Sequence, residues 1–262
     1  MTRRTRFVAT FLAALAVCMP ASAAEVRVMI SAGFFGVYSE LAPAFEKATG
    51  HKLVTTRGPS MGDSPEAIPT RLARGEAADV VIMDGHGADA LAAKGVVKAD
   101  SKVLLAKSQV GMVVRQGAAK PDISTVESFK KTLLDAKSIA YSDSGSGTYL
   151  STKLFPQMGI ADQIAGKSRK VRGPPSGEPV ANVVARGESE IGFQQVSELI
   201  HVKGVDFVGP LPAELQPGFS FAGAVTANAK EPDAGAALLK FLSSTDADPV
   251  ITKAGLAPVG SK

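Results

Sequence analysis

The sequence has few of the side chains that bind metals or form disulfides. Cysteine occurs once, at Cys18, tryptophan is absent, and histidine occurs only at His51, His86 and His201. One cysteine cannot form an intrachain disulfide, and three widely spaced histidines do not match a zinc-ligand pattern. The sequence also contains neither a P-loop nor a G-x-S-x-G motif. We therefore expect no metal, no thiol chemistry and no organic cofactor.

The chain also lacks a hydrophobic run that would span a membrane, which takes about 20 residues. An apolar stretch at 7–19 follows Arg3, Arg4 and Arg6 and precedes Ala21-Ser22-Ala23, which is typical of a secretory signal peptide covering 1–23. Without this leader, 26 of the 29 basic residues remain against 25 acidic ones. A nearly neutral mature chain argues against a nucleic-acid partner. We expect a periplasmic protein that is not inserted in the membrane.

Short apolar runs alternate with helical patterns along the mature chain. With 45% hydrophobic and 21% charged residues, the chain can bury a sizeable core. The predicted strands are 26–30, 53–56, 79–83, 138–141, 169–171 and 191–193. The predicted helices are 38–48, 68–74, 88–93, 126–134, 149–155, 180–186, 234–243 and 249–254. This alternation predicts an α/β protein with mostly parallel sheets and helices on both faces.

Two extended segments, 109–115 and 219–226, interrupt the alternation because no helix follows either closely. One interpretation is a single large α/β domain. The other is two α/β lobes joined by two crossing strands, with the C-terminal helices returning to the first lobe. The residues alone do not separate these two interpretations.

The turns after the predicted strands are rich in small polar residues. In open parallel sheets, ligands bind beyond the carboxyl ends of the strands. Glycine lets backbone N–H groups approach a ligand, hydroxyls add donors, and helix N-termini favour negative charge. These turns are 31–36, 57–60, 84–86, 143–148, 172–178 and 194–195. They favour an anion, although the same residues are also typical of ordinary helix caps.

Two arginines stand in these turns, Arg57 and Arg172. A guanidinium can form two parallel hydrogen bonds with a carboxylate, which makes both residues candidates for binding an organic acid. The alternative is that both are solvated surface residues.

Four segments carry a resemblance to a known family. They read V-R-V-M-I-S-A-G, R-L-A-R-G-E-A-A-D-V-V-I, A-R-G-E-S-E-I-G-F and A-A-L-L-K-F-L-S-S…G-L-A-P-V-G. Over 26–260 the chain resembles the periplasmic molybdate-binding proteins of the type II solute-binding fold. The resemblance implies a two-lobed monomer, each lobe a mostly parallel sheet flanked by helices, with a two-strand hinge. It places lobe I at 24–110 and 220–262 and lobe II at 111–219.

The resemblance also indicates where a ligand would bind. The family's contact positions fall at Gly33, Ser60, Ser146, near Gly177 and at Gln195. A family serine is replaced by Gly33 and a family tyrosine by Gln195. These replacements remove side-chain bulk while Arg57 and Arg172 add positive charge, which suggests a larger and more anionic ligand such as a di- or tricarboxylate. The full set of expected substrate-binding residues is Gly33, Arg57, Ser60, Ser146, Thr148, Arg172 and Gln195.

Within this group the chain is similar to the aconitate isomerases built on the same scaffold. The similarity implies interconversion of trans-aconitate and cis-aconitate by allylic proton transfer in the cleft between the lobes. The candidates for the proton-transfer group are His86, Glu178, Asp143 and Tyr149, which the sequence does not rank. The alternative is a non-catalytic receptor that delivers a carboxylate, or an oxyanion such as molybdate, to an ABC transporter permease.

Overall fold

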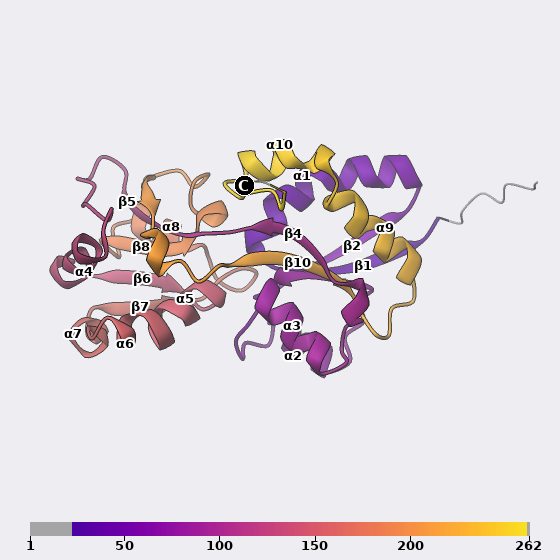
Figure 1. The fold of residues 1–262 in the computed structure, drawn as a ribbon, viewed down its shortest axis with the longest axis horizontal. Coiled ribbons are helices and arrows are strands. Elements are labelled where there is room, and N and C mark those ends of the chain that lie inside the picture. Colours follow the sequence, from indigo (N-terminus) through magenta and orange to yellow (C-terminus); the bar gives the residue numbers. More distant parts are fainter. Residues whose placement is uncertain (1–22, 261–262) are drawn as a thin grey trace, which may run out of the picture.

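Two five-stranded mixed sheets lie one after the other along the long axis of the molecule (Figure 1). The structure is a computed structural model that describes residues 23–260. The strand orders are β2-β1-β3-β10-β4 and β7-β6-β8-β5-β9. Each sheet, with its helices, forms one lobe, so the two-lobed prediction is confirmed and the single-domain alternative is wrong. The predicted signal peptide lies almost entirely outside the described residues.

Lobe I contains the first part of the chain and its C-terminal part. Its strands are β1 (Glu25–Ile30), β2 (Lys52–Arg57), β3 (Val80–Asp84), β4 (Val103–Lys107) and β10 (Ser220–Val225). Its main helices are α1 (Ala32–Thr49), α2 (Ile68–Ala73), α3 (Gly85–Ala93), α9 (Pro232–Leu242) and α10 (Asp248–Lys253). β1 pairs in parallel with β2 and β3, and β10 pairs antiparallel with β3 and β4. Every residue of β3 is buried because strands flank it on both sides.

Lobe II repeats this arrangement. Its strands are β5 (Val110–Arg115), β6 (Ile139–Ser142), β7 (Ser168–Val171), β8 (Ile191–Gln195) and β9 (Val205–Pro210). Its helices are α4 (Val126–Asp135), α5 (Gly145–Tyr149), α6 (Phe155–Gln157), α7 (Ala161–Ala165) and α8 (Val180–Ala185), with a π-helical turn at Leu150–Leu154. β6 is parallel to β7 and β8, and β5 is antiparallel to β8 and β9.

The chain crosses between the lobes twice, from β4 to β5 and from β9 to β10. Ser108 N donates to Phe219 O at 2.8 Å, which ties the two crossings together. The extended segments predicted at 109–115 and 219–226 are therefore the first strand of lobe II and the last strand of lobe I. The lobe boundaries given above stay a prediction.

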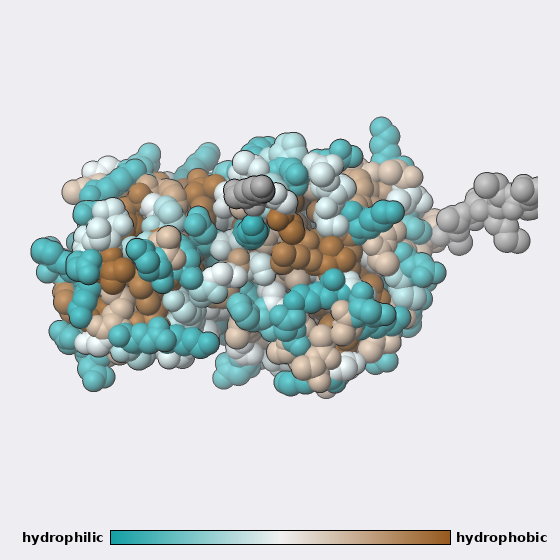
Figure 2. All heavy atoms as spheres, in the orientation of Figure 1, coloured by the Kyte–Doolittle hydropathy of each residue, from teal (hydrophilic) through white to brown (hydrophobic). Residues whose placement is uncertain are grey.

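Each lobe has its own apolar core. The core of lobe I includes Phe34, Ile82 and Leu238, and that of lobe II includes Leu154 and the perpendicular ring pair Phe129–Phe193. Figure 2 shows hydrophilic side chains over much of this face and an apolar patch over the middle of lobe I. Leu104 of β4 is 38% exposed. Within residues 23–260, no helix has the length and apolar composition needed to cross a membrane.

Three helices, α1, α3 and α5, begin three or more residues earlier than the sequence predicts, and α3 starts at Gly85. α1 starts at Ala32 and α5 at Gly145, so residues expected in turns lie in the first helical turns. The approach of α1 to β10 explains one glycine there, because a Cβ atom on Gly33 would lie 2.2 Å from Phe221 Cζ. Tertiary contact thus outweighs the low helix propensity of these glycines.

Candidate functional site

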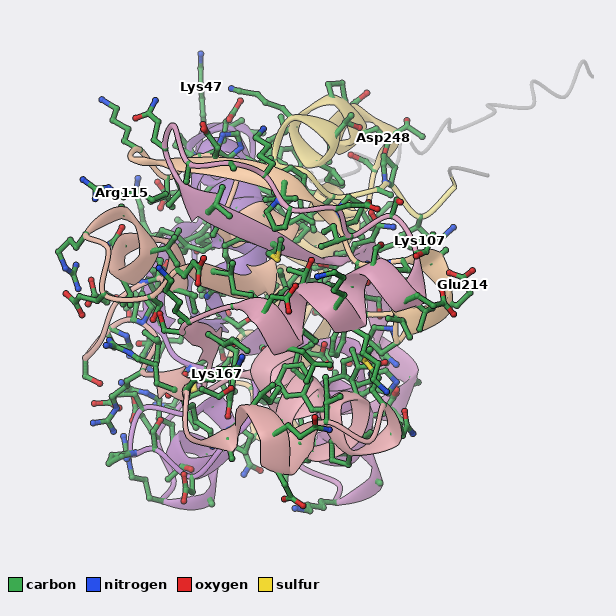
Figure 3. All side chains as sticks on the ribbon, turned by 90° about the vertical axis from the view of Figure 1, so that its left-hand side faces the viewer. Lys47, Lys107, Arg115, Lys167, Glu214 and Asp248 are labelled. Atoms are coloured by element: carbon green, nitrogen blue, oxygen red, sulfur yellow. The ribbon has the colours of Figure 1, made fainter. Side chains whose placement is uncertain are left out.

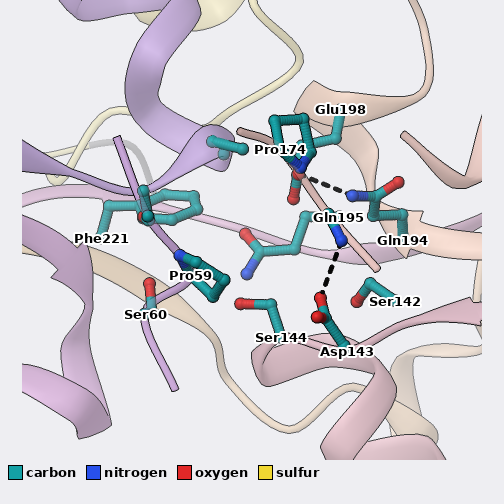
Figure 4. A pocket seen from close by; sticks show the side chains of 15 residues that line it. Pro59, Ser60, Ser142, Asp143, Ser144, Pro174, Gln194, Gln195, Glu198 and Phe221 are labelled. Carbon is teal, nitrogen blue, oxygen red and sulfur yellow. Dashed lines mark hydrogen bonds between the residues drawn. The ribbon is translucent and has the colours of Figure 1, made fainter. Parts of the chain in front are cut away.

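The carboxyl ends of the parallel strands of both lobes meet at one cavity, which we call the inner pocket (Figure 4). Lobe I lines it with Ser31, Ala32, Gly33, Gly58, Pro59, Ser60 and Phe221. Lobe II lines it with Ser142, Asp143, Ser144, Gly173, Pro174, Gln194, Gln195 and Glu198. Its volume is about 20 Å³, which holds about one water molecule. An organic acid therefore enters only when the lobes move apart.

Neutral donors on both sides of the inner pocket are free to bind a ligand oxygen. Ser31 Oγ is buried and has no hydrogen-bond partner among residues 23–260. Ser60 Oγ accepts from Asp84 N at 2.9 Å, which leaves its own proton to donate. Gln195 Oε1 accepts from Ser108 Oγ at 2.7 Å, so its amide NH₂ group remains for the pocket, and Figure 4 shows this side chain pointing between Pro59 and Ser144.

Carboxyl groups stand among these neutral donors. Glu198 accepts from Gln194 Nε2 at 2.6 Å, and Asp143 Oδ1 accepts from Gly173 N at 3.1 Å (Figure 4). Burial raises the pKa of Glu198 to about 7, although the bond from Gln194 and the charge of Arg57 oppose the shift. The nearby Asp143 raises it further. A pocket that contains carboxyl groups repels an inorganic dianion, but it can exchange protons with an organic acid.

Two grooves lie outside the inner pocket and share Met61 and Thr148. The first, here the Arg172 groove, has a volume of about 380 Å³ and is also lined by Asp143, Lys170 and Arg172. Arg172 Nη2 lies 3.5 Å from Glu66 Oε2 of the opposite lobe. The groove also contains Asp63, so it places two cationic and two acidic side chains at the entrance of the cleft.

The second groove, here the His86 groove, has a volume of about 220 Å³ and contains His86, Tyr149 and Phe219. The rings of His86 and Tyr149 both pack edge-on against the Phe219 ring. The centroid of Phe219 lies 6.3 Å from that of His86 and 5.9 Å from that of Tyr149. Tyr149 Oη donates to Leu215 O at 2.9 Å, and burial raises its pKa, so Tyr149 stays protonated and is a poor base. The His86 side chain is 64% exposed.

Asp84 forms the inner wall of the His86 groove. Its Oδ1 accepts from His86 N at 3.0 Å and lies 3.6 Å from His86 Nδ1, whereas its buried Oδ2 has no hydrogen-bond partner in the part of the chain that the structure describes. Burial raises the pKa of Asp84, and the neighbouring His86 opposes that rise. Among residues 23–260 there is no group of three or more His, Cys, Asp or Glu side chains that would hold a metal ion.

Residues 26–257 match the family of bacterial extracellular solute-binding proteins. The chain belongs to this family. It is 50% identical to an aconitate isomerase of Pseudomonas sp over 234 residues, which cover 89% of this chain and 88% of that enzyme. It is 27% identical to the molybdate-binding protein ModA of Azotobacter vinelandii over 262 residues, 96% of each chain. The family places this solute-binding protein outside the cytoplasm with a small-molecule ligand.

Solved structures agree on the fold of this solute-binding protein. The periplasmic molybdate-binding protein of Azotobacter vinelandii superposes with a TM-score of 0.69 at 21% identity, covering 88% of this chain and 98% of that chain. The sulfate-binding protein SubI of Mycobacterium tuberculosis H37Rv gives 0.70 at 21% identity, covering 90% and 88%. These neighbours confirm the two-lobed binding-protein fold, and at this identity they say nothing of the ligand.

The fold gathers some of the predicted site residues and separates others. Gly33, Ser60, Asp143 and Gln195 line the inner pocket. Thr148 lies between the two grooves, and Ser146 donates to or accepts from Ser142 Oγ at 3.0 Å without lining the pocket itself.

Arg57 and Arg172 do not converge on one pocket. The Arg57 guanidinium lies 4.1 Å from the centre of the Phe35 ring, whereas Arg172 lines the outer groove. Both therefore differ from the paired clamp expected from the sequence.

Glu178 lies apart from the pocket and both grooves of this solute-binding protein. Both of its carboxylate oxygens accept from the guanidinium of Arg186 at 2.6 Å, and this pairing lowers the pKa of Glu178. Glu178 precedes α8 and Arg186 follows it, and Glu178 lines neither the inner pocket nor either groove.

Sequence reasoning did not consider Glu198, and it placed Ser31 and Gln194 in the candidate turns without naming them as site residues. Glu198 lies in a short 3₁₀ turn, Val196–Glu198, directly after the carboxyl end of β8. An acidic residue three positions beyond Gln195 was the available signal. Its importance appears only once burial and the neighbouring Gln194 are known.

Proposed function

We propose that this solute-binding protein is a periplasmic aconitate isomerase that interconverts trans-aconitate and cis-aconitate in the cleft between its lobes. The observation that carries the proposal is the 50% identity to the aconitate isomerase of Pseudomonas sp, which extends over nearly all of both chains. The carboxyl groups among the donors of the inner pocket support it, because they can exchange protons with a bound organic acid.

The reaction moves one proton and one double bond. A base removes a proton from the methylene carbon of trans-aconitate, and the electron pair of that C–H bond delocalises over the allylic system. A proton then returns to the former vinylic carbon, so the double bond shifts and no atom or electron is gained or lost. The protein must stabilise negative charge at the carboxylates, hold a proton carrier and exclude water.

The described residues divide these tasks between the inner pocket and the entrance. Ser31, Ser60 and the Gln195 amide bind one carboxylate by neutral hydrogen bonds, and Gly33 lets α1 approach Phe221 in the wall of the same pocket. Arg172, with Lys170 beside it, binds a second carboxylate at the entrance. The tricarboxylate then spans from the inner pocket to the Arg172 groove, and closure of the two lobes of a monomer sequesters it.

The remaining predicted residues have supporting places in this scheme. Ser146 holds Ser142 in the wall of the pocket, and Thr148 lies where the substrate would leave the pocket. Arg57 supplies positive charge near Glu198. His86, Asp143 and Tyr149 surround the entrance as candidates for a second proton carrier.

A transport receptor is the second candidate, which membership of a family of solute-binding proteins supports only weakly. The resemblance to a molybdate-binding protein at 27% identity is weaker, and carboxyl groups in the pocket disfavour a dianion such as molybdate. A di- or tricarboxylate receptor that delivers its ligand to an ABC transporter permease therefore remains the only form of this alternative worth testing.

Incubation of the purified mature protein with trans-aconitate tests the proposal. We expect cis-aconitate to accumulate to the same equilibrium ratio from either isomer, measured by chromatography, and the rate to be unaffected by EDTA. A binding-only result, in which molybdate or a carboxylate raises the melting temperature but no isomerisation occurs, would refute the enzyme.

A further inference from the structure

One acidic side chain of the inner pocket is held in place by both lobes. Glu198 ends the 3₁₀ turn Val196–Glu198, whose first residue donates from Val196 N to Gln109 O at 2.9 Å. The middle residue of the turn donates from Ser197 Oγ to Gly33 O at 2.8 Å, across the cleft. When the lobes are closed, the turn is therefore fixed relative to α1 of lobe I as well as to its own lobe.

The carboxyl group of Glu198 does not have the partners of a structural carboxylate. Within residues 23–260, its single hydrogen bond comes from the neutral amide of Gln194, and no cation lies within ion-pair distance of it. Gln194 is itself fixed, because its Oε1 accepts from Val180 N at 3.0 Å. The charged groups that act on Glu198 are Arg57, which favours the carboxylate, and Asp143, which opposes it. Glu198 is half-buried, and a carboxylate removed from water without an ion pair is costly, which favours its protonated form.

The other candidate proton carriers are placed less well. His86 lies in the outer groove with its ring largely exposed, and Tyr149 donates its hydroxyl proton to Leu215 O. Asp143 lines the pocket, but its Oδ1 is engaged by Gly173 N. Glu198 is in the same closed cavity as the free donors of Ser31 and Gln195, where a substrate carboxylate and its neighbouring carbon would lie.

We infer that Glu198 is the residue that carries the proton between the two ends of the allylic system of the substrate. Its carboxylate takes a proton from the methylene carbon as that C–H bond breaks, and the resulting carboxylic acid returns the proton to the former vinylic carbon as the new C–H bond forms. The base is regenerated, so the step balances without a cofactor. This inference rests on the proposed aconitate isomerase activity.

The electrostatics of Glu198 suit both halves of the cycle. A carboxyl group with a pKa of about 7 is populated both as base and as acid near neutral pH, which is the condition for efficient proton transfer in both directions. An exposed carboxylate with an ordinary pKa would rarely be protonated there.

The test compares Glu198→Gln with the wild-type protein and with the control Glu214→Gln. Glu214 is exposed, and Figure 3 places it at the periphery of the molecule. We expect Glu198→Gln to lower kcat by about 10²–10⁴-fold, while the Kd of trans-aconitate from calorimetry stays within about threefold of wild type. Glu214→Gln should stay within about twofold in both quantities.

Three results would overturn the inference, and they are distinguishable. Turnover by Glu198→Gln near the wild-type rate would remove Glu198 from the reaction while leaving the isomerase intact. Loss of trans-aconitate binding together with turnover would make Glu198 a binding or structural residue. Absence of turnover in the wild-type protein would refute the proposed function itself and this inference with it.

A second variant covers the case in which Glu198→Gln does not fold. Glu198→Asp keeps the carboxyl group but withdraws it by one methylene, so we expect at least about a tenfold fall in kcat with little change in KM. A folded Glu198→Asp protein with full kcat would contradict a role that depends on the position of this carboxyl group.

Discussion

Arg172 of lobe II and Glu66 of lobe I face each other across the entrance of the cleft, with Nη2 and Oε2 3.5 Å apart. Glu66 belongs to the loop between β2 and α2, and Arg172 directly follows β7. Their side chains are 24% and 52% exposed, and exposed pairs of this kind contribute less than about 1 kcal/mol. The pair therefore closes the cleft only weakly, and Arg172 can exchange Glu66 for a substrate carboxylate.

Replacing Arg172 should affect binding more than folding. We expect Arg172→Met to change the free energy of unfolding by less than about 1 kcal/mol. We expect it to weaken trans-aconitate binding by about 1.5–3 kcal/mol, the contribution of a charge-assisted hydrogen bond. Calorimetric titration measures the second quantity. Arg169→Met is the control, because Arg169 is a half-exposed arginine of β7 that pairs with Glu188 away from the pockets. Equal affinity in Arg172→Met and Arg169→Met would remove Arg172 from the substrate site.

Arg57 should act on the reaction through the charge it places near Glu198. The guanidinium stacks on Phe35 and favours the ionised form of Glu198, so removing it raises the pKa of Glu198. In Arg57→Met, less of Glu198 is ionised at neutral pH, and the rising limb of kcat/KM against pH should move to higher pH. The exposed Arg115, at the surface in Figure 3, provides the control Arg115→Met. Superimposable pH profiles of the two variants would show that Arg57 does not act on the proton carrier.

Replacing Ser31 should weaken ligand binding without lowering the stability of the fold. Its hydroxyl is buried and has no protein partner, so Ser31→Ala loses no hydrogen bond within the folded protein. We expect an unchanged or slightly higher melting temperature, together with about 0.5–1.5 kcal/mol weaker trans-aconitate binding. Ser189 Oγ is also buried and unpartnered but lies outside the inner pocket, so Ser189→Ala should leave binding unchanged. If both variants bind equally well, the Ser31 hydroxyl does not contact the substrate.

Glu198 should lower stability at alkaline pH. Burial raises the pKa of Glu198 in the folded protein from 4.5 to about 7. The folded protein therefore binds the Glu198 proton more tightly than the unfolded chain does, and the resulting contribution to the free energy of unfolding is complete below about pH 4.5 and is lost as the pH rises through about 7. The free energies of unfolding of wild type and Glu198→Gln should be similar near about pH 4.5. By about pH 8, Glu198→Gln should be more stable by on the order of 3 kcal/mol. Urea unfolding across this range measures the difference, and parallel curves would show that Glu198 titrates normally.

Much of the fold follows from local sequence. β1, β3, β6 and β8 are where the sequence predicts strands, because central strands of a parallel sheet are buried on both faces and are therefore short apolar runs between polar turns. β4 and β9 were not predicted. Both lie at the edges of their sheets and keep several half-buried or exposed residues, so the apolar pattern that marks a strand is weak. Their partners β10 and β5 lie about a hundred residues away along the chain.

The sequence by itself determined that glycine, serine and carboxyl groups would stand at the strand ends, because the alternation of strands and helices fixes where those ends meet. Within those turns, the resemblance to the molybdate-binding family indicated Gly33, Ser60 and Gln195, and the similarity to the aconitate isomerases made Asp143 a candidate proton carrier. Only the tertiary structure decided that Arg57 stacks on Phe35 and that Glu66 faces Arg172. It alone placed the Glu198 carboxyl group in the inner pocket. Side-chain direction and burial depend on contacts between distant segments, and burial sets whether a carboxyl group binds a proton near neutral pH.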